Sequence, residues 1–352
     1  MDEAVRRRHA DALIERCYVG LDATTLRGEV LRRLRGVVSV DAAFFATLDP
    51  VTLLFTSVAS EEPLIDAAGL FLDNEFGAHD VNRFAELAAA ADPVRSLDAA
   101  TGGERRASVR YREIMAPLAL GDELRVVLRA TGRSWGVMCL HREEAAAGFD
   151  EQEIALVRRI GPHVAEGMRR ALLTATAVEG TQPAAGIGIV VLAADLAVKS
   201  INAAAESWLA RIRDEDWPST HPLPLVVQGL ASELVHAQEQ HAISEPEVRL
   251  RTSTGDWLSI RATWLHGDGP AQIAIVLEPA TAGRLASMLF AARGLTPAQE
   301  RVAAQVLQGR DTRQIVAELH ISQHTVQEHL KGVFDKFGVR SRRELVASLL
   351  GH

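Results

Sequence analysis

Short apolar stretches separated by turn residues fill much of the first 174 residues, and helical spacing begins and ends this segment. Apolar residues from Ile154 to Leu172 recur every three or four positions, which predicts a long helix with one buried stripe. Gly161-Pro162 is expected to kink this helix. Helical spacing also dominates residues 1–38. The stretches that predict strands are 42–48, 53–58, 124–130 and 135–140.

The pattern starts again after a linker at residues 175–185, which contains Gly180 and Pro183. Asn202 follows two apolar stretches, and its short acceptor side chain is expected to cap the helix that begins there. From Leu258 to Trp264, apolar and polar residues alternate, which predicts a strand with one buried and one solvent-exposed face. The strands predicted in this segment are 187–192, 198–201 and three later ones, which include 258–264 and 273–277 and are joined by hairpin turns at 254–256 and 267–269.

A short helix at 281–292 and four further helices are predicted in the last part of the chain from periodicity and capping residues. On the first of them, a face with Leu285, Met288 and Leu289 either pairs with a second copy or packs on its own domain. The four later helices begin at or after Thr296, Thr312, Ser322 and Ser341 and end near Gly309, Leu319, Phe337 and Leu350.

The helix that follows Ser322 comes after a tight turn, so it takes the place of the second helix in a helix-turn-helix. In that arrangement the second helix enters the major groove of DNA. Gln327, Glu328 and Lys331 are then placed at base edges, where Gln can pair with adenine, Glu with cytosine and Lys with guanine. The apolar face of this helix consists of Val326, Leu330, Val333, Phe334 and Phe337, and the polar face of His324, Gln327, Glu328, Lys331 and Asp335.

The charge distribution separates the end of the chain from the rest. The net charge of the 352 residues is −8, but residues 293–352 contain nine Lys/Arg and six Asp/Glu and so carry +3. The preceding 292 residues therefore carry −11. A small basic module on an acidic body is typical of a protein that binds nucleic acid through one end, although an excess of this size also arises by chance.

The composition, with 47% hydrophobic and 24% charged residues, is that of a soluble globular protein with two or three domains. The first residues are charged, and the longest uncharged apolar run, 186–194, is too short to cross a membrane. We therefore expect a cytoplasmic protein with no membrane partner. No His-Glu-x-x-His spacing and no serine at a nucleophile elbow is recognised, so we expect no enzymatic activity.

Cysteine and histidine give only weak indications of a cofactor. Cys139 lies in a predicted strand, which favours an inert buried thiol over a redox sensor paired with the distant Cys17. His221, His236 and His241 are candidate haem ligands, but lone histidines are far more often surface or capping residues. No metal and no cofactor is predicted, and the residues that would hold a small-molecule ligand are unknown.

The residues of the last segment that match one family of DNA-binding domains are Leu295-Thr296-Pro297, Gly309, Ile315, Leu319, Ile321-Ser322, Thr325-Val326, His329-Leu330, Lys336-Phe337 and Val339. On these residues, 293–350 resemble the LuxR-type (NarL/FixJ-like) DNA-binding domain, an all-α four-helix domain. By position, this resemblance implies base contacts from Gln327, Glu328 and Lys331, and pairing of two domains through the last helix with Leu345, Val346 and Leu349. It implies phosphate-side contacts from Thr296, Ser322, Thr325 and Lys336. The family usually has Lys or Arg at the position of Gln327.

Two resemblances of lower specificity cover the acidic part of the chain. The strand around Arg133–Met138 and the helix opening at Phe149–Leu156 resemble a GAF domain over about residues 22–173, and the strands before Asn202 resemble the start of a PAS domain. The fold class is therefore α+β, with GAF-like and PAS-like antiparallel-sheet sensor domains before the helix-turn-helix. The expected boundaries are 1–174, 186–280, 281–292 for a linker helix, and 293–352.

Together these features predict a one-component bacterial transcription regulator that binds a palindromic site on double-stranded DNA as a homodimer. A small-molecule effector in a GAF-like or PAS-like domain would control it, and RNA polymerase is a further partner that this function allows. One alternative is a protein-interaction regulator whose GAF and PAS domains only dimerise. A second alternative is a redox switch or an orphan enzyme that uses the GAF-like pocket.

Overall fold

The computed structural model describes residues 3–77, 80–176, 186–212, 223–239, 241, 245–267 and 269–350. The chain divides into two compact units, Met1–Pro279 and Ala280–His352, which are called unit 1 and unit 2 below. Unit 1 contains two five-stranded antiparallel sheets with helices, and the regular elements described in unit 2 are all helices. The predicted α+β fold class is therefore confirmed. None of the described helices is long and apolar enough to cross a membrane.

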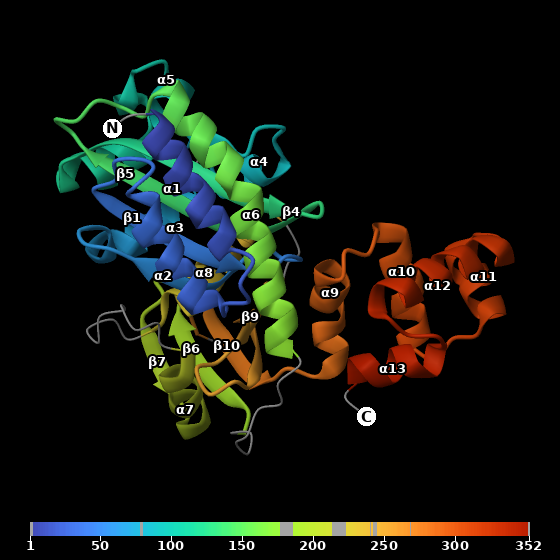
Figure 1. Ribbon diagram of the computed structural model, residues 1–352. Coiled ribbons are helices and arrows are strands. Elements are labelled where there is room, and N and C mark those ends of the chain that lie inside the picture. Colours follow the sequence, from blue (N-terminus) through green and yellow to red (C-terminus); the bar gives the residue numbers. More distant parts are fainter. Residues whose placement is uncertain are drawn as a thin grey trace. The chain divides into compact units, whose positions relative to one another are not determined.

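Residues 3–176 form the first sheet of unit 1 and its helices. The strands are β1 Ala42–Leu48, β2 Phe55–Ser60, β3 Val94–Ser96, β4 Leu120–Ala130 and β5 Arg133–Glu143. The α-helices are α1 Glu3–Arg16, α2 Ala23–Leu34, α3 Ala68–Phe76, α4 Phe84–Ala89, α5 Leu97–Thr101 and α6 Glu151–Thr176. There are also three short 3-10 helices, η1 Leu64–Ala67, η2 Arg105–Ala107 and η4 Ala116–Leu118, and a π-helix, η3 Tyr111–Met115. The strand order is β2-β1-β5-β4-β3 (Figure 1).

Helices cover both faces of this sheet. Helix α6 packs on one face together with α1 and α2, and α3 and α4 contribute to an apolar core on the other. The predicted strand at 42–48 is confirmed, but β2 begins at Phe55, because Leu53 adopts a left-handed conformation with φ 63° in the turn before it. Helix α6 continues through Pro162. Helices α3 to α5 lie between the strands predicted at 53–58 and 124–130, where helical and loop sequence is expected without defined bounds, whereas strand β3 is not predicted.

Residues 186–279 form the second sheet, in the order β7-β6-β10-β9-β8. Its elements are β6 Gly188–Ala193, β7 Val198–Ile201, α7 Ala203–Ile212, α8 Leu225–Glu239, β8 Glu247–Arg251, β9 Trp257–Leu265 and β10 Gln272–Pro279. The predicted cap at Asn202 is confirmed, because its Oδ1 accepts a hydrogen bond from Ala205 N at 2.9 Å and a second one from Ile189 N at 3.0 Å. One side chain thus fixes the start of α7 against β6.

The two sheets of unit 1 share their cores. Leu54, which precedes β2, is buried in the core of the second sheet, and Leu225 of α8 is buried in the core of the first. Asp49 and Arg249 form a buried ion pair between them, with Nε to Oδ2 at 2.8 Å and Nη2 to Oδ1 at 3.0 Å. The linker residues 177–185 lie outside the described residues, so the boundaries at 174 and 186 stay a prediction.

Unit 2 consists of α9 Ala282–Ala292, α10 Pro297–Leu307, α11 Thr312–Leu319, α12 Gln323–Phe337 and α13 Arg342–Leu350 (Figure 1). The ends agree with the sequence prediction to within about two residues. Side-chain caps fix the starts of α10, α11 and α12. Ala286 and Phe290 of α9 lie in the same core as Val302, Val326 and Leu345. Helix α9, expected as a linker, therefore packs as part of the helical unit.

Candidate functional site

A tight turn between α11 and α12 sets the geometry of the candidate DNA interface. Helix α11 ends at Leu319 and is followed by His320, which adopts the left-handed conformation with φ 53°, and α12 begins at Gln323. Ser322 caps α12, since its side chain accepts a hydrogen bond from Thr325 N at 3.1 Å. Asp311 caps α11 in the same way with Gln314. Two capped helices joined by so short a turn form the helix-turn-helix that the sequence predicted.

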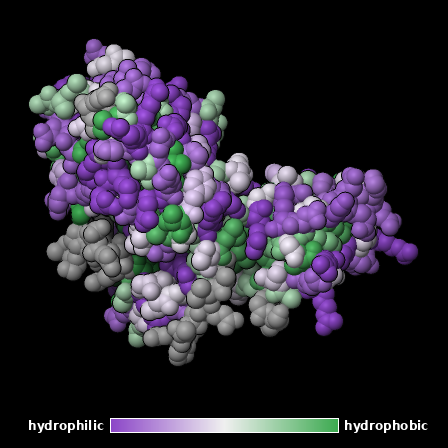
Figure 2. Space-filling view, in the orientation of Figure 1, coloured by the Kyte–Doolittle hydropathy of each residue, from purple (hydrophilic) through white to green (hydrophobic). Residues whose placement is uncertain are grey.

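Helix α12 has the two faces that its sequence predicted. Val326, Leu330 and Val333 are buried with at most 2% of their surface exposed. Gln327, Glu328 and Lys331 are all exposed, and their spacing of one, three and four positions places them on one side of the helix. In Figure 2 hydrophilic residues cover the surface of unit 2 around α11. The predicted base readers are therefore accessible and adjacent.

The cations of unit 2 fall into two groups. Lys331 is exposed and makes no ion pair with any described residue, and the same holds for Arg301, Arg313, Arg340 and Arg343. In contrast, Arg310 pairs with Glu318, and Arg342 donates hydrogen bonds to Arg310 O and Thr312 Oγ1, both at 2.9 Å. Glu328 lies 3.5 Å from His324 Nε2 one turn earlier. The unpaired cations are the ones available to phosphates.

The predicted phosphate-side residues differ in their surroundings. Thr296 and Ser322 cap α10 and α12, so they lie where first-turn N–H groups can bind an anion, and the Thr325 hydroxyl contacts that of Ser322 at 2.9 Å. Lys336 is half-buried, and its ammonium donates to Gly294 O at 2.6 Å and Gln299 Oε1 at 2.8 Å. Its ammonium thus holds the start of α10 against α12, and a phosphate would have to compete for it.

The residues predicted to pair two domains are mostly part of the core. Leu345 and Leu349 are buried with 0% and 4% of their surface exposed, while Val346 is half-buried. The first two therefore stabilise unit 2 itself. Pairing through α13 would depend on Val346 and on exposed neighbours such as Arg343 and Ser348.

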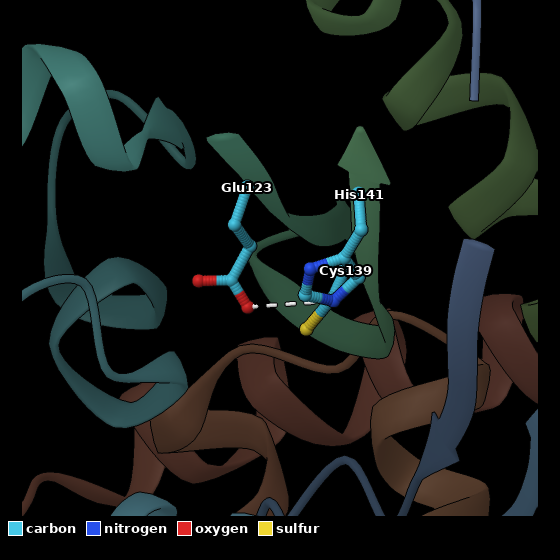
Figure 3. Close-up of side chains that lie close together, drawn as sticks. All are labelled: Glu123, Cys139 and His141. Atoms are coloured by element: carbon cyan, nitrogen blue, oxygen red, sulfur yellow. Dashed lines mark ion pairs between the residues drawn. The ribbon is translucent and has the colours of Figure 1, made fainter. Parts of the chain in front are cut away.

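A buried polar cluster lies in the first sheet of unit 1. Glu123 of β4 and Cys139 and His141 of β5 point toward one another (Figure 3), with His141 Nε2 3.8 Å from Glu123 Oε1. Burial alone would raise the pKa of Glu123, but the charges of Arg110 and Arg125 hold it well below its usual range. Burial raises the pKa of the Cys139 thiol well above its ordinary value and lowers that of His141 to about 4. At neutral pH the cluster is one carboxylate, one thiol and one neutral imidazole.

This cluster is a poor metal site although it offers three ligand types. Both oxygens of Glu123 accept hydrogen bonds, from Arg110 Nε at 2.8 Å and from Arg125 Nε at 3.0 Å. A thiol with a raised pKa resists the deprotonation that metal binding requires. The prediction that Cys139 is buried is confirmed. Of the candidate haem ligands, His221 lies outside the described residues, and His236 Nδ1 contacts Glu239 Oε2 at 2.9 Å.

A small cavity adjoins the cluster. The cavity has a volume of about 20 Å3, which is enough for one or two water molecules. Apolar side chains from β1, α3, η3 and α8 line it, with His141, Glu123 and Arg110 at its polar end. The Nδ1 atom of His141 is buried and has no hydrogen-bond partner among the described residues. The residues that line this cavity come from eight separate elements, β1, β2, η1, α3, η3, β4, β5 and α8, so no local motif could have indicated them.

One serine spacing had been overlooked in the sequence. Residues 132–136 read Gly-Arg-Ser-Trp-Gly, which has the Gly-x-Ser-x-Gly spacing of a nucleophile elbow. The structure places this run at the hairpin between β4 and β5, where Ser134 is 5% exposed and pairs with Arg129 across the strands. A nucleophile elbow joins a strand to a helix, so Ser134 is not a candidate nucleophile.

Comparison with known proteins identifies a family for most of unit 2 and finds relatives of larger parts of the chain. Residues 293–349 match the family of bacterial regulatory proteins, luxR family. A probable HTH-type transcriptional regulator, GfsR of Streptomyces halstedii, is 24% identical over 195 residues, which cover 54% of this chain and 71% of that protein. The spore germination protein GerE of Bacillus subtilis is 36% identical over 56 residues, covering 16% of this chain and 76% of that protein. The crystal structure of the phage VqmA–DPO complex is similar with 18% identity over 51% of this chain and 88% of that chain, at a TM-score of 0.20.

Proposed function

Because this chain belongs to the luxR family of bacterial regulatory proteins and is a DNA-binding transcription regulator, we propose that α12 reads the bases of its target site. We further propose that unit 1 senses the signal that controls this binding. The observation that carries the first part is the exposed face of α12, on which Gln327, Glu328 and the unpaired Lys331 lie together. The two proposals are testable separately.

Each of these three side chains has a chemical counterpart on a base edge. The amide of Gln327 can donate to and accept from adenine, the carboxylate of Glu328 can accept from the amino group of cytosine, and Lys331 can donate to guanine. The N-termini of α10 and α12, with Thr296, Ser322 and Thr325, would orient the unit on the phosphates. Arg301 and Arg313 supply exposed positive charge on neighbouring helices.

Two copies of the protein would bind a palindromic site. A single small DNA-binding module buries roughly 600–1,000 Å2 of protein surface, which is low for a specific complex. A homodimer doubles that area and fixes the distance between two copies of α12. In this proposal unit 1, with its GAF-like segment 1–174 and PAS-like segment 186–280, responds to a small-molecule effector. RNA polymerase would be the further partner if the bound protein activates transcription.

The reading role of α12 can be tested with the full-length protein. A high-affinity duplex is first selected from a randomised pool, and binding to it and to a scrambled duplex is measured at several salt concentrations. Lys331→Ala should weaken specific binding by about 1–3 kcal/mol if Lys331 reads a guanine. If it contacts phosphate only, the loss should be equal on both duplexes and the salt slope should fall by about one.

The control is Lys199→Ala, which removes the same charge from exposed strand β7 of unit 1. It should leave specific binding and the salt slope unchanged. If Lys331→Ala, like this control, left the affinity for the selected duplex unchanged, α12 would not be the helix that contacts the bases.

A further inference from the structure

A cleft in unit 1 is large enough for a small molecule. It has a volume of about 410 Å3, within the range of pockets that hold such ligands. One side is formed by the β1–β2 turn, the end of α3 and helix α4, and the other by α8. The cleft therefore lies between the two sheets of unit 1, apart from the 20 Å3 cavity beside His141.

The inner surface of the cleft is aromatic. Phe55, Phe76 and Phe84 line it, with ring centroids 5.8 Å apart for Phe55 and Phe76 and 6.5 Å apart for Phe55 and Phe84. Leu48 and Leu53 extend this surface. Such rings favour an apolar or aromatic body, and ring faces also attract a cation.

The polar groups of the cleft leave one carboxylate unpaired. Glu75 accepts a hydrogen bond from Phe84 N at 2.7 Å and pairs with Arg125, Arg83 contacts Glu86 at 3.2 Å, and His236 contacts Glu239. Glu233 of α8 lines the same cleft and makes no hydrogen bond or ion pair with the residues that the structure describes. Burial raises the pKa of Glu233 despite the nearby charges of His236 and Arg83. An ammonium group beside Glu233 would pair with its carboxylate and so offset the cost of burying that negative charge.

We propose that this cleft binds a small primary amine with an apolar or aromatic body. The ammonium donates hydrogen bonds to the Glu233 carboxylate, and the body contacts Phe55, Phe76 and Phe84. A neutral analogue of the same shape keeps only the apolar part of these interactions. An anionic ligand is disfavoured beside Glu233, because the unpaired carboxylate would repel it.

Binding in this cleft would act on both sheets at once. The amine would contact α3 and α4 of the first sheet and α8 of the second, and α8 also carries Leu225 into the core of the first sheet. As the signal of a regulator, this ligand rests on the function proposed above. Its binding, however, can be measured without DNA, so failure of one proposal is distinguishable from failure of the other.

The test uses the full-length protein with benzylamine as the probe and benzyl alcohol as its neutral analogue, followed by titration calorimetry. Benzylamine should bind more tightly than benzyl alcohol. Glu233→Gln should lower the affinity for benzylamine by roughly 10- to 100-fold, which is the usual effect of losing a hydrogen bond to a charged group. The affinity for benzyl alcohol should stay unchanged. Glu206→Gln changes an exposed carboxylate on α7 that does not line the cleft; it is the matched control and should leave both affinities unchanged.

A second variant tests the position of the site. Ala85 lines the cleft and is exposed, so Ala85→Leu should fold normally and weaken both probes by narrowing the cleft. The proposal is overturned if benzylamine does not bind at millimolar concentration, if benzyl alcohol binds equally well, or if Glu233→Gln leaves benzylamine affinity unchanged. DNA binding measured on the same preparations, with circular dichroism as a check of folding, separates these results from a loss of structure.

Discussion

The two units use charged side chains in opposite ways. In unit 1, Arg110, Arg125 and Arg249 are buried with at most 4% of their surface exposed, and each faces at least one buried carboxylate. In unit 2, Lys331 and Arg313 are exposed and unpaired among the described residues. Arginines of the first kind stabilise a fold, whereas exposed cations of the second kind can neutralise a phosphate.

The difference shows why net charge alone is a weak guide to DNA binding. Residues 293–352 carry only +3, and the rest of the chain carries −11 although it contains most of the arginines. What matters is whether a cation already has a partner. Lys336 makes the point within unit 2 itself, because its ammonium is committed to Gly294 and Gln299 and differs from that of Lys331 only in position.

The largest effect should come from breaking a buried pair in unit 1. Asp49→Ala removes the carboxylate that Arg249 faces between the two sheets, and breaking a buried pair on one side costs about 3–5 kcal/mol of unfolding free energy. All five tryptophans precede residue 280, so tryptophan fluorescence during urea unfolding reports on unit 1. Unit 2 contains no tryptophan, so its own unfolding does not contribute to this signal.

The matched control is the exposed pair of Glu3 and Arg7, with 57% and 64% of their side chains accessible. Glu3→Ala should lower the unfolding free energy by less than about 1 kcal/mol. If Asp49→Ala had an effect as small as this, the buried pair would not hold the two sheets together, and the contrast between the units would lose its main support.

A smaller effect is expected from acid, again in unit 1. The pKa of His141 falls from 6.5 to about 4 on burial, so between these values the unfolded chain binds a proton that the folded chain does not. The neutral, buried His141 therefore makes its full contribution to the unfolding free energy above pH 6.5. This contribution is lost as the pH falls toward 4, and the loss from this group amounts to at most about 3 kcal/mol.

His141→Phe keeps an aromatic ring on β5 but cannot be protonated. Urea unfolding followed by tryptophan fluorescence at pH 7, 6 and 5 should show a shallower loss of stability in this variant than in the wild type. Parallel pH profiles for the two proteins would mean that His141 is as easily protonated in the folded chain as in the unfolded one.

Sequence reasoning succeeded where structure is determined locally. The helices of unit 2 begin at Ser322, Asp311 and Thr296, whose side chains cap the residues directly after them, and Asn202 does the same for α7. The exposed face of α12 also follows from spacing alone. These features depend on residues within a few positions of one another.

What sequence reasoning missed depends on contacts between distant residues. Helices α3 and α8 lack a clear pattern because both are buried on more than one side, α3 with Asn74 and Glu75 in a polar network and α8 with Leu225 and Leu230 in two different cores. The cleft with Glu233 joins segments about 180 residues apart in sequence. Neither an alternating pattern nor a short motif predicts a contact between segments so far apart in sequence.

The smallest expected effect sharpens the comparison by adding a cation to unit 2. Gln327→Lys places the charge usual in the family beside Lys331 on the exposed face of α12. Binding to a scrambled duplex should strengthen, and the slope of log affinity against log salt should steepen by about 0.9, since one more phosphate is neutralised. Gln238→Lys adds the same charge to an exposed position of α8 in unit 1 and should leave the slope unchanged. Gln327→Ala, which changes no charge, should keep the wild-type slope but relax the base preference at one position of the selected site. Equal slopes for both lysine variants would place α12 away from the phosphates, and unit 2 would then have to bind DNA through another of its faces.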